Sequence, residues 1–390
     1  MKELIKTVQD LIRLESTNPG KEERSVAEYI KNYLGDCGAE IIEDPVFPGR
    51  NNVIATIGGE IKAPMLVLIC HMDTVVAGAD WTRDPFAAET EENRIYGRGA
   101  CDMKSGFACA LSVFRETAEK YQKGEISLDK PLRLIGTVDE EGNMEGVENA
   151  IRKGRVTADD WVMDLEPTDG QIQMAHQGRF WLEVSVQGIT AHASRPEQGA
   201  DAIAAAAQWI SSMRKAFGEL PVHQELGRST ITFGQIQGGY QPYVVPDLCR
   251  LWVDCRLAPP VNDLMVQSMA DRAIKEAEQE ISGVKISYKI TGNRPYIEKD
   301  PDSGLLKEIK RAVHTVTRKE AEVCPFPGYT DTAVIAGRLQ NRNCLSYGPG
   351  NLKYAHKPDE FVETEDIERC HKVLQELLEG CVCKKIQSSY

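Results

Sequence analysis

Residues 65–73 read MLVLICHMD, so that six apolar residues are followed at once by a histidine and then by an aspartate. An apolar run of this length favours a strand buried on both faces, as in a parallel sheet covered by helices. The same arrangement recurs twice, because the runs LRLIGTV and WVMDL lead directly into Asp139-Glu140-Glu141 and into Glu166. In an open parallel sheet such residues converge on the crevice beyond the carboxyl ends of the strands, where ligands bind.

Around these runs, segments with helical and with strand-like periodicity alternate. The expected helices cover 4–12, 26–34 and 105–117, and the expected strands cover 41–46, 52–57, 65–70, 132–138 and 161–165. This alternation indicates an α/β fold with a mostly parallel sheet flanked by helices.

After Gln177 the pattern changes to strand, helix, two strands, helix and strand. The expected segments are 181–187, 200–217, 229–236, 248–257, 262–281 and 284–290. The order β-α-β-β-α-β is that of the ferredoxin-like α+β unit, which folds by itself. We therefore expect an insertion at 177–291 between two parts of one domain, 1–176 and 292–390.

The composition narrows the class of protein. A chain of 390 residues exceeds the usual size of a single core. The net charge of −13, without a clustered Lys/Arg stripe, argues against a nucleic-acid surface. Eleven scattered cysteines indicate reduced thiols rather than a disulfide framework. No segment approaches the roughly 20 apolar residues that span a bilayer, and the N-terminal helix lacks a leader-type apolar region. We expect a cytoplasmic protein without nucleic-acid or membrane partners.

Histidine, aspartate and glutamate, the residue types that follow the expected strands, are the types that bind metal ions. Zinc takes His nitrogen and Asp/Glu oxygen, and a hydrolytic pair of ions needs about five such ligands with one carboxylate shared. Asp73 is suited to accept the second N–H of the neighbouring imidazole. Of Glu140 and Glu141, one would bind metal and the other would move a proton, and the residues alone leave both assignments open. The candidate ligands are His71, Asp102, Glu141, Glu166 and His356.

Five blocks, in order along nearly the whole chain, resemble a family of cocatalytic zinc amidohydrolases. This family comprises acetylornithine deacetylase, succinyl-diaminopimelate desuccinylase, aminoacylase and glutamate carboxypeptidase. The blocks are CHMDTV at 70–75, YGRGACDMK at 96–104, DEEG at 139–142, EPT at 166–168, and GPG at 348–350 followed by His356 and Glu360.

The resemblance implies a zinc-peptidase type of sheet and two divalent ions, most simply Zn²⁺, with Co²⁺ or Mn²⁺ as alternatives. It implies Glu140 as general base. It implies that Asp102 bridges the ions, that His71 and Glu166 complete one site, and that Glu141 and His356 complete the other.

In the insertion, GITAHASRP at 188–196 resembles the motif of the family's dimerisation domain. The resemblance implies a homodimer in which His192 reaches the partner's site and stabilises an oxyanion. Arg256 and the loop with Gly328, Thr330 and Asp331 resemble elements that hold the substrate's carboxylate, for which a guanidinium fork is suited. Asp331 has the alternative of capping the following helix. The chain departs from many relatives at Tyr243, where they carry Asn.

The expected function is hydrolysis of the amide bond of an N-acyl amino acid by a metal-bound hydroxide. A metallo-exopeptidase, either a carboxypeptidase or a dipeptidase acting on a short peptide, would use the same site and is the alternative. A non-catalytic amino-acid-binding relative is a third hypothesis, against which the proton-transferring Glu140 argues. The other histidines lack companions at ligand spacing and are expected to serve the surface or core: His176, His223, His314 and His371. The pair Cys381 and Cys383 could bind metal, but we expect it to be a chance feature of the C-terminal segment.

Overall fold

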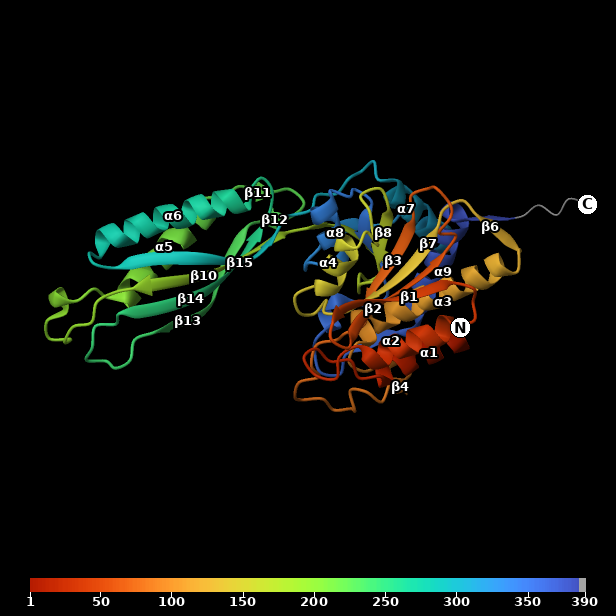
Figure 1. Ribbon diagram of the computed structural model, residues 1–390, viewed down its shortest axis with the longest axis horizontal. Helices are drawn as coiled ribbons and strands as arrows, with labels where there is room; N and C mark the ends of the chain where they lie inside the picture. Colours follow the sequence, from red (N-terminus) through yellow and green to blue (C-terminus); the bar gives the residue numbers. More distant parts are fainter. Residues whose placement is uncertain (386–390) are drawn as a thin grey trace, which may run out of the picture. The chain divides into compact units, whose positions relative to one another are not determined.

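An eight-stranded sheet forms the centre of the first of two units in the computed structural model, which describes residues 1–385 (Figure 1). The first unit comprises Met1–Met174, Lys299–Phe326 and the chain from Thr330 onward. The strand order is β1-β2-β7-β3-β8-β17-β9-β16. The strands are β1 (Glu40–Phe47), β2 (Arg50–Ile57), β3 (Leu66–His71), β7 (Leu132–Thr137), β8 (Trp161–Asp164), β9 (Ile172–His176), β16 (Val323–Phe326) and β17 (Cys344–Ser346).

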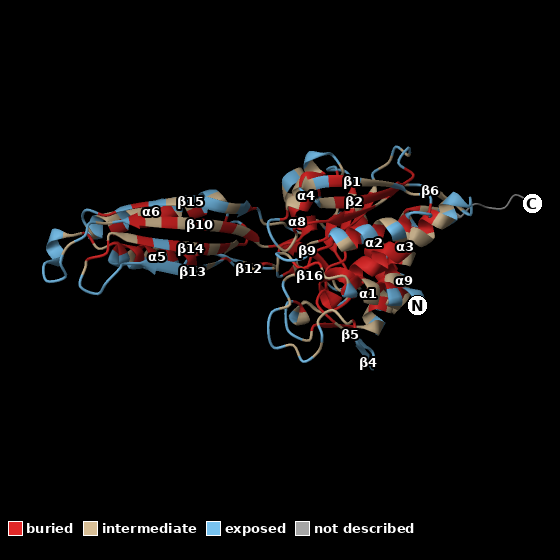
Figure 2. Cartoon of the chain, turned by 60° about the horizontal axis from the view of Figure 1, so that its bottom comes forward, coloured by how far each residue is buried: buried red, intermediate tan, exposed pale blue. Residues whose placement is uncertain are grey.

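The four central strands β7, β3, β8 and β17 run parallel, as the sequence predicts for the sheet. The pairs β1–β2, β2–β7 and β9–β17 are antiparallel. Every residue of β3 is buried, because helices cover both faces of the sheet, and the central strands are largely red in Figure 2. The mostly parallel α/β architecture is thus confirmed, with antiparallel strands added outside its centre.

Two groups of helices sandwich this sheet (Figure 1). One face carries α1 (Lys2–Arg13), α2 (Arg24–Leu34), α3 (Ser105–Gln122), α7 (Gly304–Thr317) and α9 (Thr364–Cys381). The other carries α4 (Glu145–Arg152) and α8 (Asp331–Leu339). Small accessory sheets join β18 (Phe361–Glu363) to β5 (Arg94–Tyr96) and β4 (Thr90–Glu91), and β19 (Cys383–Lys385) to β6 (Ile126–Leu128).

The second unit, Ala175–Glu298 with Pro327–Tyr329, is built on a four-stranded antiparallel sheet. Its order β13-β14-β10-β15 and its chain order β-α-β-β-α-β are those of the ferredoxin-like unit, so this part of the predicted fold is confirmed. The elements are β10 (Gly178–Gln187), α5 (Ala202–Gly218), β13 (Thr230–Gly238), β14 (Leu248–Leu257), α6 (Asp263–Glu280) and β15 (Lys285–Arg294).

The burial of the second sheet alternates along its strands, as Figure 2 shows for β10 and β14. Helices α5 and α6 cover one face of the sheet. Two features differ from the prediction. A short hairpin, β11 (Val222–His223) with β12 (Gly227–Arg228), was not expected, and β15 continues to Arg294 rather than ending at 290. A register shift opposite Trp181 and Leu182 lets β15 stay paired over its added length.

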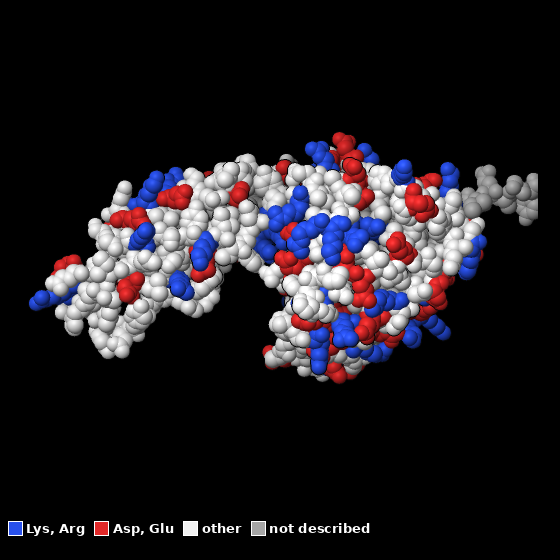
Figure 3. Space-filling view, in the orientation of Figure 1, with Lys and Arg blue, Asp and Glu red and all other residues white. Residues whose placement is uncertain are grey.

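Charged side chains of both signs lie interspersed on the face shown in Figure 3. Many of the cations in the first unit pair with acids, as Arg338 does with Glu148. None of the helices within residues 1–385 is long and apolar enough to cross a membrane.

One buried ion pair makes the first unit's stability depend on pH. Asp44 of β1 is 3% exposed and accepts hydrogen bonds from Lys153 Nζ at 3.2 Å and from Arg155 Nε at 3.0 Å. Burial raises the pKa of Asp44, but the bonds from these two cations outweigh it and leave the pKa below its usual value. The carboxylate therefore stabilises the fold above the unfolded pKa of about 3.9, and this contribution is lost as pH falls through the folded pKa.

We expect Asp44→Asn to lower the free energy of unfolding by about 1.5 to 3 kcal/mol at pH 7, as for a buried hydrogen bond to a charged group. The difference from the wild type should shrink below a pH of about 4. Urea unfolding followed by tryptophan fluorescence at several pH values measures it. Glu43→Gln on the same strand is the control, since its half-exposed pair with Lys31 should contribute under 1 kcal/mol. A difference independent of pH would contradict the assignment.

Candidate metal centre

The candidate ligands lie where parallel strands end. His71 is the last residue of β3 and pairs in register with Thr137, the last residue of β7. The acidic loop with Glu141 follows β7, and Glu166 lies two residues beyond β8. Asp102 belongs to an irregular helical turn, Ala100–Lys104, that leads into α3. His356 follows β17 through the short turn Leu352–Tyr354.

The structure brings all five candidate ligands together. His71 Nε2 lies 3.1 Å from Asp102 Oδ1 and 3.7 Å from Glu166 Oε1. His356 Nε2 lies 3.3 Å from Asp102 Oδ2 and 3.1 Å from Glu141 Oε1. The two oxygens of Asp102 therefore face different histidines, which is the arrangement of a carboxylate that can be shared between two cations.

Hydrogen bonding fixes the tautomer of His71. Its Nδ1 lies 2.9 Å from the main-chain carbonyl oxygen of Asp73. A carbonyl oxygen only accepts, so Nδ1 carries a proton, and Nε2 is the ring nitrogen that faces Asp102. This orientation is the one that a histidine needs to bind a metal through Nε2.

Asp73 accepts the second N–H of the imidazole through its main-chain carbonyl and not through its carboxylate. The carboxylate Oδ1 lies 3.8 Å from His71 Nδ1, and the main-chain carbonyl makes the contact instead. The carboxylate accepts hydrogen bonds from the main-chain N–H groups of Glu140 and Glu141, both at 3.2 Å. Asp73 thus connects the end of β3 to the acidic loop after β7.

The electrostatics of this cluster fit bound cations. Burial raises the pKa of Glu140 well above its usual value. The charge of His71 lowers this pKa, and the charge of Glu141 raises it. Burial and the charge of Asp102 likewise raise the pKa of Glu166 well above its usual value. Hydrogen bonds to Asp102 and Glu141 raise the pKa of His356 to about 10. Divalent cations also stabilise such crowded carboxylates, and three carboxylates with two imidazoles match the donor set of a zinc pair.

The buried ion pair of Arg98 and Glu360 holds the main chain at Asp102. Glu360 Oε1 accepts the main-chain N–H groups of Cys101 at 2.8 Å and of Asp102 at 3.1 Å. Its other oxygen pairs with Arg98, and both side chains are 1% exposed. Arg98 and Glu360 belong to two different blocks of the family resemblance, at 96–104 and 348–360, and the resemblance gave neither a role. Membership of these blocks is the only signal in the sequence, because the two residues are 262 positions apart.

Two glycines let the loop of Glu166 pack closely. A Cβ on Gly106 at the start of α3 would lie 2.1 Å from the carbonyl oxygen of Leu165, and a Cβ on Gly348 would lie 2.3 Å from the same atom. Any side chain at either position would displace the main chain next to Glu166.

Thr330 and Asp331 lie buried in the first unit. The Thr330 hydroxyl accepts the N–H of Ala333, so Thr330 caps α8 and Asp331 does not. Asp331 Oδ2 accepts a hydrogen bond from Thr137 Oγ1 at 2.7 Å, and burial raises the pKa of Asp331 to about 7. Asp331 therefore lies next to the strand end that precedes the acidic loop.

His192 and Arg256 belong to the second unit, as does Gly328. Arg256 forms a forked pair with Asp254, with Nε at 2.8 Å and Nη2 at 3.2 Å from its two oxygens. The exposed His192 accepts the main-chain N–H of Ser194 at Nδ1, so its neutral ring carries the proton on Nε2. Ala193, the residue after His192, donates its main-chain N–H to the carbonyl oxygen of Tyr243. The side chain of Tyr243 is exposed.

Only His71, Asp102 and Glu141 form a group of His, Cys, Asp or Glu atoms mutually within ligand distance among residues 1–385. His176, the last residue of β9, is buried, and burial lowers its pKa to about 4. His371 contacts Ser112 Oγ at 3.0 Å, and His314 is largely exposed. His223 accepts main-chain N–H groups of its own turn, as a structural histidine does.

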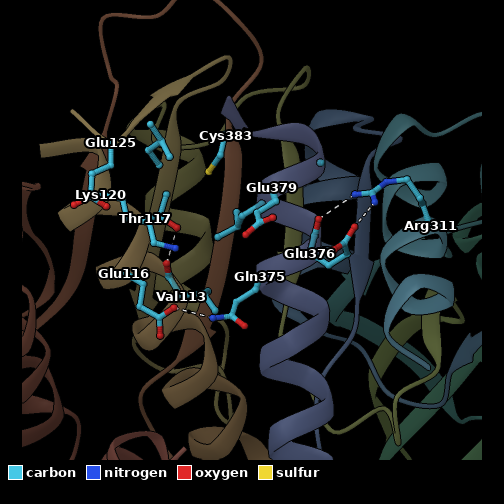
Figure 4. Close-up of a pocket in the computed structure, with 13 residues that line it drawn as sticks. Val113, Glu116, Thr117, Lys120, Glu125, Arg311, Gln375, Glu376, Glu379 and Cys383 are labelled. Atoms are coloured by element: carbon cyan, nitrogen blue, oxygen red, sulfur yellow. Dashed lines mark hydrogen bonds and ion pairs between the residues drawn. The ribbon is translucent and has the colours of Figure 1, made fainter. Parts of the chain in front are cut away.

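A cavity of about 640 Å³ lies elsewhere, between α3, α7 and the end of α9 (Figure 4). Among its lining residues, Arg311 pairs with Glu376 and Gln375 donates to Glu116. Figure 4 shows these pairs along the cavity wall, where Cys383 also lies. The cavity contains none of the candidate ligands.

Known proteins resemble this chain in sequence over nearly all of its length. A probable succinyl-diaminopimelate desuccinylase of Staphylococcus aureus (strain N315) is 28% identical over 395 residues, covering 93% of this chain and 94% of that protein. An acetylornithine deacetylase of Pectobacterium carotovorum subsp. carotovorum (strain PC1) is 28% identical over 359 residues, covering 90% and 88%.

Solved structures share the fold. Aminopeptidase PepT from Bacillus cereus ATCC 10987 superposes with a TM-score of 0.78 at 22% identity, covering 97% of this chain and 98% of that one. An M20 family metallo-carboxypeptidase from Sulfolobus solfataricus gives a TM-score of 0.74 at 19% identity, covering 97% and 99%. The family model described as Peptidase family M20/M25/M40 matches residues 67–380, and this chain therefore belongs to that family.

Proposed function

We propose that this amide hydrolase releases an amino acid from an N-acyl amino acid by means of two divalent cations. The proposed cation is Zn²⁺. The observation that carries the proposal is the position of Asp102, whose two oxygens face His71 and His356 separately. The desuccinylase and deacetylase relatives, each aligned over at least 88% of its length, support the choice of an acylated amino acid.

When bound, the cations would lower the pKa of coordinated water to about 7 and polarise the scissile carbonyl. The residues of the chain do the rest. Glu140 receives a proton from the attacking water and passes it to the leaving nitrogen. Asp73 holds the Glu140 main chain at 3.2 Å, which limits where that carboxyl group can lie. Glu141 shares the loop but turns its oxygen to His356, so we assign it to the metal.

We assign His192 to the oxyanion and propose that it acts in the partner's site of a homodimer. Its Nε2–H is a donor of the kind that stabilises such a charge, because Ser194 occupies Nδ1. Strand β13 is an edge of the second sheet with mostly exposed residues, and such an edge is able to pair with a second copy. The eleven cysteines, all free in this structure, support a reducing, cytoplasmic setting.

His192→Ala is expected to keep both metals and lower kcat by about 10² to 10³, the loss typical of one oxyanion donor. Mixing this variant with Glu140→Gln tests the dimer. A mixed dimer of two otherwise inactive chains contains one site with both residues intact, so about a quarter of the wild-type activity should return. No recovery after verified subunit exchange would contradict action across the dimer.

A metallo-exopeptidase with the same site is the second candidate, favoured by the peptidase family to which the chain belongs. A panel of N-succinyl and N-acetyl amino acids, dipeptides and tripeptides distinguishes the two. Preference for the acylated amino acids supports the deacylase, and preference for peptides supports the exopeptidase.

Removal and return of metal tests hydrolysis of either kind. A chelator should abolish turnover, and Zn²⁺ or Co²⁺ should restore it. If the metal-loaded protein bound amino acids but hydrolysed nothing across the panel, it would be a non-catalytic binder and the proposal would be wrong.

A further inference from the structure

The side-chain amide of Asn18 lies between two buried carboxylates. Its Nδ2 is 2.9 Å from Asp73 Oδ2 and 3.1 Å from Asp139 Oδ1. Ionised carboxylates only accept, so the NH₂ group must face them, and it has one hydrogen for each. Asp73 is 0% and Asp139 is 5% exposed, so both bonds form away from water, where an unmatched polar group is costly.

The backbone of Asn18 is anchored to the strand that ends in His71. The Asn18 main-chain N–H donates to Thr74 O at 2.8 Å, and Thr74 N–H donates to Ser16 O at 3.0 Å. Ser16 and Thr74 are completely buried. The amide group therefore projects from a fixed stretch of chain beside the extension of β3.

The two carboxylates that Asn18 joins hold different ends of the acidic loop. Asp73 accepts the main-chain N–H groups of Glu140 and Glu141. Asp139 begins the loop with a φ of 66°, a left-handed conformation that costs a non-glycine residue energy. Its N–H donates to Glu23 Oε1 at 3.1 Å, and its Oδ2 accepts the N–H of Asn143 at 3.2 Å.

Without a donor between them, the carboxylates of Asp73 and Asp139 would repel each other in a site of low dielectric. The amide replaces that repulsion with two hydrogen bonds and ties β3 to the loop after β7. His71 lies at one end of this connection, through the carbonyl of Asp73, and Glu141 lies at the other.

We propose that Asn18 is a positioning residue that sets the distance between the half-site of His71 and the half-site of Glu141. The inference rests on the proposed two-cation function. Asn18 contacts neither candidate ligand directly. It acts on the place of the Glu141 main chain, so its loss should weaken the cation on the Glu141 and His356 side more than the cation on the His71 side.

Two substitutions test this with little change in volume. Asn18→Asp keeps the shape but turns an oxygen toward the two carboxylates, and Asn18→Leu removes the donors altogether. Asn341→Leu is the matched control. Asn341 is buried in the first unit, and its amide donates to the main-chain carbonyls of Thr157 at 3.0 Å and Asp160 at 2.8 Å.

Titration calorimetry of the metal-free proteins with Zn²⁺, and the absorption spectrum with Co²⁺, report on metal binding without substrate. We expect both Asn18 variants to bind the second ion about tenfold to a hundredfold more weakly, the usual loss for a partner behind a ligand. The Asn341→Leu control should lose thermal stability comparably and keep both affinities.

Unchanged affinities in the Asn18 variants, or an equal loss in the control, would overturn the positioning role. If the wild type bound two ions but hydrolysed no substrate, the proposed function would be wrong. The positioning role of Asn18 would still be decided by the metal affinities of its variants. If the wild type bound no divalent cation, both would be wrong.

Discussion

Asp102→Ala is expected to leave a protein that retains neither cation at stoichiometric level and has no measurable turnover. Each oxygen of Asp102 faces a different histidine, so the substitution removes a donor from both half-sites at once. The remaining donors on the Glu141 side would be one histidine and one carboxylate, fewer than the three protein ligands of a catalytic zinc site. The loss should exceed the roughly hundredfold seen when a partner behind a ligand is removed.

Metal content after dialysis, measured by inductively coupled plasma mass spectrometry, checks this prediction. Asp129→Ala is the control, because that aspartate is exposed and pairs only loosely with Lys384 at 3.8 Å. Circular dichroism should be the same for both variants. Retention of two tightly bound ions by Asp102→Ala would contradict the shared-carboxylate arrangement.

Glu140→Gln is expected to keep both ions and to lower kcat by about 10² to 10⁴, the range for loss of a general acid–base group. Glutamine has the same shape, and the main-chain bond from Glu140 to Asp73 does not depend on the side chain. KM should change little, because the proton transfer occurs after substrate binds.

Glu141→Gln is the matched comparison, since Glu141 contacts His356 at 3.1 Å and belongs to the metal group. It should lose one ion. If Glu140→Gln lost metal and Glu141→Gln kept it, the two roles would be reversed.

The central sheet was predictable because its strands carry their own signal. Fully apolar runs such as that of β3 are buried on both faces, and that burial requires helices on either side. The β11–β12 hairpin was not predictable, because its strands of two residues each have no periodicity to read. The antiparallel direction of β1 and β2, which were expected as strands, was not predictable, since strand direction depends on connections rather than on side-chain pattern.

That His71, Glu141 and Glu166 lie close together was predictable from their places after apolar runs, and Asp102 and His356 joined them as candidates by residue type. The residues that contact these candidates from outside the group were not predictable. Asn18 lies 55 and 121 positions from the two carboxylates it joins, and no local pattern relates them. Asp73 was singled out correctly as a neighbour of His71, but only coordinates could distinguish its carbonyl from its carboxylate as the acceptor. The sequence likewise could not indicate that Thr330 rather than Asp331 caps α8, because both residue types are favourable N-caps.

Anomalous diffraction at the zinc edge, from crystals of the zinc-loaded protein, tests the central claim most directly. The arrangement of His71, Asp102 and His356 predicts two peaks of similar height on either side of the Asp102 carboxylate. One should lie beside His71 and Glu166, and the other beside Glu141 and His356. A single peak, or peaks away from Asp102, would contradict a two-cation centre built from these five side chains.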